Sequence, residues 1–233
     1  MRNRKKLVVL SGAGISAESG LQTFRDSDGL WMGHDIATVA TPEGYATNPE
    51  LVLQFYNMRR REVASAKPNP AHFALAAMEA EYDVTIITQN IDDLHERSGS
   101  TKVVHLHGEI FKMFSPASPN ELIKIKGDII LGNCCGAEIQ YRPFVVWFGE
   151  AVPMIDEAIK ITRCADFFAV IGTSLQVYPA ASLVEFVPLT SPVFIIDKKI
   201  PYLQSSANVI KIEMSATEGV PVFRNALKKY GSR

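Results

Sequence analysis

Three small residues near the N-terminus have the spacing of a phosphate-binding turn. Gly12, Gly14 and Ala17 follow the pattern G-x-G-x-x-A, directly after the apolar residues 7–10 and Ser11. Glycine lets a backbone turn tightly off a strand and approach a pyrophosphate, and the N–H groups of a following helix favour an anion. A strand-to-helix turn without a ligand would carry the same glycines, so the pattern alone leaves both interpretations open.

Polar side chains follow a second apolar segment, residues 84–88. This segment is typical of a buried parallel strand, and Gln89, Asn90 and Asp92 come directly after it. Because ligands of open α/β sheets bind beyond the carboxyl ends of the strands, these side chains are candidates for a binding site.

A histidine closes the next predicted strand, residues 103–109. An imidazole titrates near neutral pH, so His107 could act as a general base. The other histidines of this region, His72, His95 and His105, are better explained as structural side chains.

Tyr56 and Arg59 lie three residues apart on a predicted helix that begins at Pro49 and is stopped by Pro68. This spacing places both side chains on one face. Arg59 also begins a run of three arginines, and such a run is most often a solvated surface.

Apolar segments that alternate with helical ones predict an α/β fold: a Rossmann-like, mainly parallel sheet with helices on both faces and a small inserted domain. Residues 34–48 are predicted to be part of a long loop, and residues 145–150 a further strand. Later strands are predicted over 167–171, 193–196 and 209–212. Helices are predicted over 70–81, 156–163, 179–187 and 218–230.

The composition is that of an ordinary globular protein, with 233 residues, 47% hydrophobic and 21% charged, and a formal charge of −1. This charge favours neither a nucleic-acid nor a membrane partner, and the apolar run after the basic N-terminus is too short for a signal peptide. We expect a cytoplasmic monomer. Three cysteines, two of them adjacent, do not make a disulfide framework.

With these segments in order, the chain resembles the sirtuins, the NAD-dependent protein deacylases. The matching motifs are GAGISAESGLQTFR, TQNIDDLH, HLHGE, RPFVVWFGEAVP and GTSLQVYPAA, which together with the closing helix span nearly the whole chain. The resemblance implies an NAD-binding domain formed by residues 1–33, 71–111 and 145–233. It implies a small domain formed by residues 34–70 and 112–144, a helical module and the remnant of a zinc module.

The same resemblance implies a set of residues that bind NAD as cofactor. They are Gly12, Ala13, Gly14 and Ser16 at the pyrophosphate, Phe24 and Arg25 in the loop over the nicotinamide ribose, Gln89, Asn90, Ile91 and Asp92 at the nicotinamide, and Gly172, Thr173, Ser174, Val177, Asp197 and Ala216 around the adenosine. Asp197 stands where the family normally has an Asn, which is an altered but workable ribose contact.

His107 and Asn90 match the catalytic positions of the family. His107 would take a proton from the ribose hydroxyls, and the products would be nicotinamide, lysine and O-acyl-ADP-ribose. Val146, Phe148, Gly149 and Glu150 match a strand that pairs with acyl-lysine protein or peptide substrates through main-chain hydrogen bonds.

The Tyr56-x-x-Arg59 pair matches the sirtuins that remove succinyl and malonyl groups. A guanidinium grips a carboxylate through two parallel hydrogen bonds, and a phenol adds a third donor. We therefore expect acidic acyl groups to be preferred, with deacetylation as a further activity left open.

The chain departs from the family at its metal site. Sirtuins usually hold a structural zinc through two Cys-x-x-Cys pairs, whereas only Cys134 and Cys135 are present here, which is too few for a tetrahedral site. We expect no bound zinc. Instead, apolar packing within residues 113–133 is predicted to compensate, by Phe114, Leu122, Ile123, Ile125, Ile129, Ile130 and Leu131.

Two other functions within this fold stay open, namely mono-ADP-ribosyl transfer to a protein and non-enzymatic NAD binding. The presence of both His107 and Asn90 argues against the second. A hydride-transfer dehydrogenase is disfavoured, because no acidic residue follows the glycines on a second strand where the ribose would need it.

Overall fold

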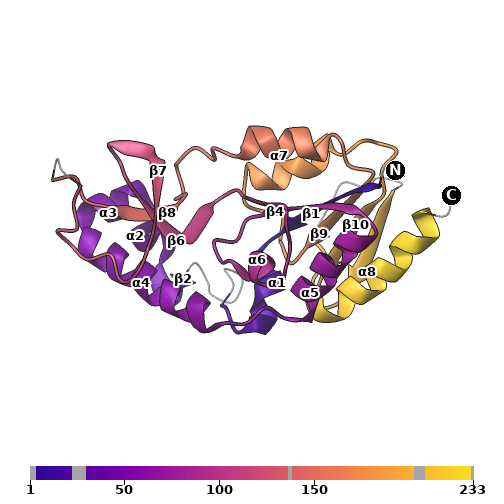
Figure 1. Ribbon diagram of the computed structural model, residues 1–233, viewed down its shortest axis with the longest axis horizontal. Coiled ribbons are helices and arrows are strands. Elements are labelled where there is room, and N and C mark those ends of the chain that lie inside the picture. Colours follow the sequence, from indigo (N-terminus) through magenta and orange to yellow (C-terminus); the bar gives the residue numbers. More distant parts are fainter. Residues whose placement is uncertain (1–3, 23–29, 136–137, 202–207, 232–233) are drawn as a thin grey trace.

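The most apolar segments of the chain form one parallel sheet of six strands (Figure 1). The structure is a computed structural model, which describes residues 4–22, 30–135, 138–201 and 208–231. The strand order is β11-β10-β9-β1-β4-β5. The strands are β1 (Lys6–Ser11), β4 (Asp83–Thr88), β5 (Val103–His105), β9 (Phe167–Ile171), β10 (Val193–Asp197) and β11 (Val209–Glu213).

The chain changes direction across this sheet at β1. From β1 it proceeds to β4 and β5 on one side, and later to β9, β10 and β11 on the other. Crevices for ligands form at such a switch point, outside the carboxyl ends of the strands. The predicted phosphate turn after β1 lies there, beside the turn after β9. This topology confirms the predicted fold class.

Helices cover both faces of the sheet, as its continuous burial requires. On one face, α5 (Pro70–Ala77), η3 (Met78–Ala80) and α8 (Ala216–Gly231) pack against Leu7 and Val9. On the other face, α7 (Ile155–Thr162) and the 3₁₀ helix η4 (Ala180–Phe186) pack against Val8 and Leu10. Short helices follow β1 and β4, namely α1 (Ala13–Ser16), η1 (Ala17–Ser19) and α6 (Leu94–Arg97). We call this unit the sheet lobe.

A second unit, the small lobe, lies to the left of the sheet lobe in Figure 1. It contains β2 (Leu30–Trp31), β3 (His34–Asp35), α2 (Ile36–Val39), α3 (Pro42–Thr47) and α4 (Pro49–Ser65). It also contains an antiparallel sheet of order β7-β6-β8, formed by β6 (Gly108–Ser115), β7 (Ser118–Lys124) and β8 (Arg142–Val145). The small domain predicted from the sequence is thus present as a helical and an antiparallel part, while its predicted boundaries stay a prediction.

The prediction of a loop over residues 34–48 is wrong for most of that segment. Asp35 caps α2, because its side chain accepts a hydrogen bond from the backbone N–H of Ala37 at 2.8 Å. Thr41 caps α3 in the same way, through Gly44 N–H at 3.0 Å, and Pro42 begins that helix. Side-chain caps and an N-terminal proline therefore start two short helices.

Two predicted strands also differ from the structure. The strand predicted over 103–109 is divided, since β5 ends at His105 and β6 begins at Gly108 in the other sheet. Gly108 has a φ of 84°, which a side chain would disfavour, and this turns the chain toward the small lobe. The strand predicted over 145–150 ends where it was expected to begin, because β8 closes at Val145.

The apolar packing predicted within residues 113–133 is mostly wrong. Of the residues proposed to pack there, Ile129 is buried, whereas Leu122, Ile123, Ile130 and Leu131 are exposed. Instead, polar groups of α4 hold this segment. Asn57 donates to the carbonyl of Ile129 at 2.7 Å and accepts from its N–H at 2.9 Å.

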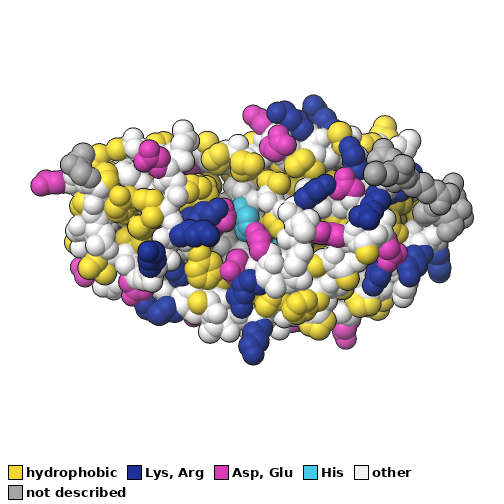
Figure 2. Space-filling model, viewed as in Figure 1, with side chains coloured by type: hydrophobic (Ala, Val, Ile, Leu, Met, Phe, Trp, Pro, Cys, Tyr) yellow, Lys and Arg dark blue, Asp and Glu magenta, His cyan; other side chains and the backbone are white. Residues whose placement is uncertain are grey.

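Positive and negative side chains are interspersed on the face shown in Figure 2. Within the described ranges, no helix has the length and apolarity needed to span a bilayer.

Candidate active site

A cleft of about 500 Å³ lies between the two lobes, at the carboxyl ends of β1, β4 and β9. Its far wall is formed by α4 and by the segment that follows β8. The cleft brings together most of the residues predicted from the sequence: Gly12, Ala13, Gly14, Ser16, Tyr56, Arg59, Gln89, Asn90, Ile91, Asp92, His107, Val146, Phe148, Gly149, Glu150, Gly172, Thr173, Ser174 and Val177.

The glycines of the predicted phosphate turn permit close packing of two backbone segments. Gly14 N–H donates to the carbonyl of Gly172 at 2.8 Å, and a Cβ on Gly14 would lie 2.7 Å from Gly172 Cα. Gly172 has a φ of 64° and faces Ile15 N–H at a distance that also excludes a side chain. The two turns therefore form one surface at the switch point. The helix after the first turn is short, since α1 ends at Ser16.

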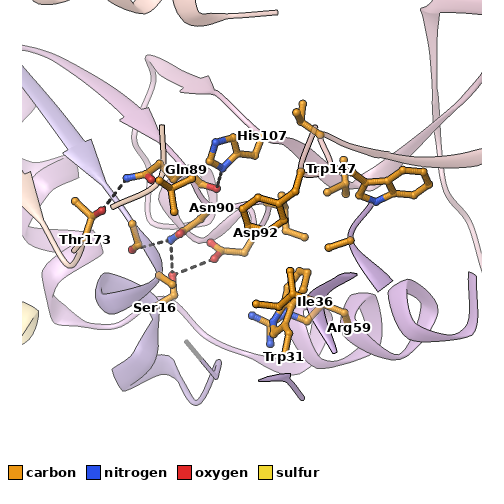
Figure 3. Close-up of a pocket in the computed structure, with 18 of the residues that line it drawn as sticks. Ser16, Trp31, Ile36, Arg59, Gln89, Asn90, Asp92, His107, Trp147 and Thr173 are labelled. Carbon is orange, nitrogen blue, oxygen red and sulfur yellow. Dashed lines mark hydrogen bonds between the residues drawn. The ribbon is translucent and has the colours of Figure 1, made fainter. Parts of the chain in front are cut away.

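A buried polar network ties this turn to the end of β4 (Figure 3). Asn90 Nδ2 donates to the carbonyl of Gly12 and to Ser16 Oγ, both at 3.2 Å. Ser16 Oγ in turn donates to Asp92 Oδ2 at 3.0 Å. On the neighbouring wall, Gln89 Nε2 donates to Thr173 Oγ1 at 3.0 Å. Three strand ends are thus fixed relative to one another by side chains from separate motifs.

Asp92 is 5% exposed, and its surroundings have opposing effects on its pKa. Burial raises the pKa of Asp92 and prevails over the hydrogen bonds from Leu94 N–H and Ser16 Oγ–H, and over the charge of Arg59, which lower it. A carboxyl with a raised pKa on a cleft wall is a common feature of binding and catalytic sites.

His107 is oriented by a backbone carbonyl. Its Nδ1 lies 2.9 Å from the carbonyl oxygen of Gln89, which can only accept a hydrogen bond. Nδ1 therefore carries the proton, and Nε2 is left with its lone pair. Burial lowers the pKa of His107 below 6.5, against the smaller upward effect of the Gln89 carbonyl. The side chain is thus neutral and able to accept a proton at neutral pH.

His105, two residues earlier, has surroundings that shift its pKa in the opposite direction. Its Nδ1 lies 3.1 Å from the carbonyl of Asn90, and its Nε2 lies 2.7 Å from Glu96 Oε1. Burial alone would lower the pKa of His105, but the Glu96 carboxylate outweighs it and raises the pKa. Both ring nitrogens face acceptors, which favours the charged form of His105, and that form has no lone pair for general-base chemistry.

Tyr56 and Arg59 form the far end of the cleft. Tyr56 is 1% exposed, and its Oη accepts a hydrogen bond from Trp147 Nε1 at 2.9 Å. Burial raises the pKa of Tyr56, so the phenol keeps its proton and can donate it. Arg59 is 7% exposed; its Nη2 donates to the carbonyl of Gln22 at 3.3 Å, and its guanidinium lies 5.8 Å from the ring centroid of Trp31.

The segment after β8 forms a turn rather than the predicted strand. Gly149 has a φ of 89°, and Glu150 accepts hydrogen bonds from Trp147 N–H at 2.8 Å and from Arg142 Nη1 at 2.8 Å. The Arg142 guanidinium lies 3.4 Å from the Trp147 ring centroid. Glu150 thereby fixes the turn that carries Trp147, which in turn contacts Tyr56.

Some predicted site residues lie elsewhere. Asp197, at the end of β10, and Ala216, at the start of α8, do not belong to the cleft lining described above. Phe24 and Arg25 fall outside the described residues.

Other cleft residues were not predicted as site residues, chiefly Trp31, Trp147 and Gln22. Trp147 lies inside the motif RPFVVWFGEAVP, so its position was visible. Its contact with Tyr56, which is 91 positions away, was not.

A family comparison assigns this architecture. The Sir2 family model matches residues 12–179, and thus the phosphate turn, the end of β4, His107 and the turn after β9. The chain belongs to the Sir2 family.

Two relatives named NAD-dependent protein deacylase illustrate the similarity. The one from Helicobacter pylori is 51% identical over 93% of this chain and 94% of its own length. The one from Bacteroides thetaiotaomicron is 47% identical over 96% of this chain and 98% of its own length.

Solved Sir2 structures have the same fold. A Sir2 homolog in complex with NAD has a TM-score of 0.86 and 36% identity, covering 97% of this chain and 91% of its own. A Sir2 protein with a deacetylated p53 peptide and 3′-O-acetyl ADP ribose has a TM-score of 0.79 and 29% identity, covering 96% of this chain and 94% of its own. The prediction of a sirtuin-type enzyme is confirmed.

The residues of this Sir2 cleft fit a dinucleotide. Buried polar side chains, Ser16, Asn90 and Asp92, gather beside a glycine turn at the switch point of the sheet. This combination of a close-approach backbone and convergent polar groups is what a dinucleotide needs.

Proposed function

We propose that this chain is an NAD-dependent protein-lysine deacylase that prefers succinyl and malonyl groups. The observation that carries the acyl preference is the Arg59 guanidinium, which is buried on the cleft wall with an Nε that has no hydrogen-bond partner among the described residues. A buried guanidinium with too few partners costs free energy, and a carboxylate bound at its cleft-facing side would offset part of that cost.

In this proposal, NAD is held on the side of the cleft that the sheet lobe forms. Gly12, Ala13, Gly14 and Ser16 would face the pyrophosphate, and Asn90 and Asp92 would orient the nicotinamide. Gly172, Thr173 and Ser174 would line the adenosine side. When bound, NAD supplies an electrophilic ribose carbon for the acyl oxygen as nicotinamide leaves.

His107 would serve as the general base. Its Nδ1–H is fixed by the Gln89 carbonyl, so Nε2 is the atom that accepts a proton from a ribose hydroxyl. The lowered pKa of His107 keeps Nε2 free of a proton at neutral pH.

The far end of the cleft would bind the acyl carboxylate. Arg59 offers the second N–H of Nη2, whose first hydrogen goes to the Gln22 carbonyl, and Tyr56 offers its phenol proton because Trp147 Nε1–H already donates to its oxygen. Each hydrogen bond to a charged group is worth about 1.5–3 kcal/mol. The charged donors of Arg59 would therefore favour a succinyl over an acetyl group, which offers no carboxylate.

The test compares succinyl-, malonyl- and acetyl-lysine peptides of one sequence, with nicotinamide release as the readout. Arg59→Met should lower kcat/KM for the acidic acyl groups by about 10- to 100-fold and leave acetyl turnover little changed. Arg61→Met is the matched control, because Arg61 is on the same helix but exposed and paired with Asp128. Equal loss for all acyl groups in Arg59→Met would contradict the assignment.

Labelled NAD separates the remaining alternative in the same experiment. A deacylase transfers the label to O-acyl-ADP-ribose, whereas a mono-ADP-ribosyltransferase leaves it on a protein acceptor. Absence of nicotinamide release with every acyl-lysine peptide would contradict the proposed function as a whole.

A further inference from the structure

Arg59 has an acidic neighbour on its own helix. Arg59 Nη1 donates to Glu62 Oε2 at 3.2 Å, an i,i+3 pair within α4. The side chain of Arg59 is 8% exposed and that of Glu62 is 40% exposed. Glu62 thus contacts the guanidinium from the solvent side, while Arg59 itself reaches the cleft wall.

Arg59 does not depend on Glu62 for its placement. The Gln22 carbonyl accepts from Nη2 at 3.3 Å, Met32 Sδ lies 4.0 Å from Nη1, and the Trp31 ring lies beneath the guanidinium. These contacts come from the segment before α2 rather than from α4, and the one to the Gln22 carbonyl is made by the terminal nitrogen that Glu62 does not contact. The guanidinium would therefore keep its position if the charge of Glu62 were removed.

We propose that Glu62 tunes the affinity of the far end of the cleft for acidic acyl groups by competing with the substrate carboxylate for Arg59. This inference rests on the proposed function. One guanidinium then faces two carboxylates when a succinyl group enters, one from Glu62 and one from the substrate. The two acids repel each other, and Glu62 has to give up part of its contact or turn toward solvent.

The size of this effect is bounded by the exposure of Glu62. Ion pairs with a solvent-exposed partner are worth up to about 1 kcal/mol, which corresponds to a change of about fivefold in an equilibrium constant. The effect should shrink as salt is added, because one partner is open to solvent. A neutral acyl group such as acetyl should not sense Glu62, since it brings no second carboxylate.

The experiment is steady-state kinetics of Glu62→Gln with succinyl- and acetyl-lysine peptides of one sequence, at low and high salt. Glutamine keeps the side-chain length and an oxygen acceptor for Arg59 but carries no charge. We expect KM for the succinyl peptide to fall about three- to fivefold at low salt, with kcat unchanged and with acetyl KM unchanged. Glu50→Gln, the same change at an exposed position at the start of α4, is the control for net charge and should alter neither KM.

A double variant ties the effect to Arg59. In an Arg59→Met background, Glu62→Gln should no longer change the succinyl KM. The inference is overturned if Glu62→Gln behaves like Glu50→Gln, or if it changes both acyl groups equally. If Arg59→Met still loses succinyl turnover in that case, the proposed function stands and only the role of Glu62 fails. If wild type and Arg59→Met do not differ on succinyl peptides, both fail.

Discussion

Backbone carbonyls and one carboxylate decide the chemistry of the two histidines in the motif HLH. His107 has one fixed donor and one free lone pair, because Gln89 offers a single acceptor. His105 donates from both nitrogens, because Glu96 and the Asn90 carbonyl lie at its two sides. The same residue type is thus neutral at one position and favours the charged form at the other, and only the neutral one can act as a base.

The pH dependence of turnover should therefore report His107. Burial lowers the pKa of His107 below 6.5, so kcat/KM should stay level near pH 7 and fall on the acidic side, with a midpoint below that of a free imidazole. The measurement is a pH profile of kcat/KM with an acetyl-lysine peptide. Glu96→Gln is the control: it removes the partner of His105 and should leave the midpoint in place. A midpoint that moves with Glu96→Gln would assign the acidic limb to His105 instead.

At the scale of elements, continuous apolar runs predicted the sheet well. Val84–Thr88 and the runs at 7–10, 167–171 and 193–196 are buried on both faces in the structure, as parallel strands require. The run at 145–150 is apolar as well, yet β8 ends at Val145. Trp147 is buried against Tyr56 in the small lobe rather than in a sheet. Apolarity thus predicts burial, but it does not predict which partner buries a segment.

The candidate site, too, has residues that the sequence could predict and contacts that it could not. Residues that follow strands, such as Gln89, Asn90 and His107, could be predicted because the topology of a parallel sheet gathers strand ends. The Trp147 contact with Tyr56 and the Glu62 contact with Arg59 could not be predicted as site features. The first joins segments 91 positions apart, and the second has the spacing of any surface ion pair on a helix.

Asn57 is the residue by which α4 should hold the segment around Ile129. It exchanges two buried hydrogen bonds with the Ile129 backbone and accepts a third from Arg60 Nη1 at 2.8 Å. Asn57→Ala leaves those buried groups without partners and should lower the free energy of unfolding by about 2–4 kcal/mol. Chemical denaturation measures this loss. Arg61→Met, which breaks an exposed pair with Asp128 beside the same segment, should cost less than about 1 kcal/mol. Equal effects of the two variants would show that the buried contacts of Asn57 do not hold this segment.

At the scale of the whole molecule, histidines buried between the helices make the stability of the fold depend on pH on the acidic side. His72 on α5 and His95 on α6 are fully or nearly fully buried, with ring centroids 5.0 Å apart. Burial lowers the pKa of His72 to about 4, and it lowers that of His95 well below 6.5. His105 acts in the opposite direction. Its pKa is raised in the folded chain, so protonation of His105 stabilises the folded state, and this contribution is fully present below pH 6.5.

The contribution of His72 has a definite sign. Its pKa is lower in the folded than in the unfolded chain, so the unfolded state binds more protons and stability is lost as the pH falls below 6.5 toward about 4. Between pH 7 and pH 5 this amounts to about 2 kcal/mol. Urea denaturation of wild type and His72→Leu over this range measures the free energy of unfolding. This free energy should change less with pH in the variant, even if the substitution also alters stability by a constant amount at every pH. Parallel curves would contradict a titrating role for His72.

The stability of the small lobe bears on the predicted absence of zinc. Among the described residues, no group of three or more His, Cys, Asp or Glu side chains is placed to hold a metal ion, and Cys134 is exposed. The contacts from Asn57, Arg60 and Arg61 tie α4 to the segment over 127–129, which follows β7 of the small antiparallel sheet. We therefore expect elemental analysis of the purified protein to find far less than one zinc per chain. Incubation with a chelator should leave the thermal midpoint unchanged, because a chain without bound zinc has no metal–ligand bonds to lose. The Asn57→Ala variant should lower that midpoint with or without chelator. One tightly held zinc per chain, or a midpoint that falls when the metal is removed, would show that the chain recruits ligands beyond its adjacent cysteines and that hydrogen bonds to α4 do not suffice.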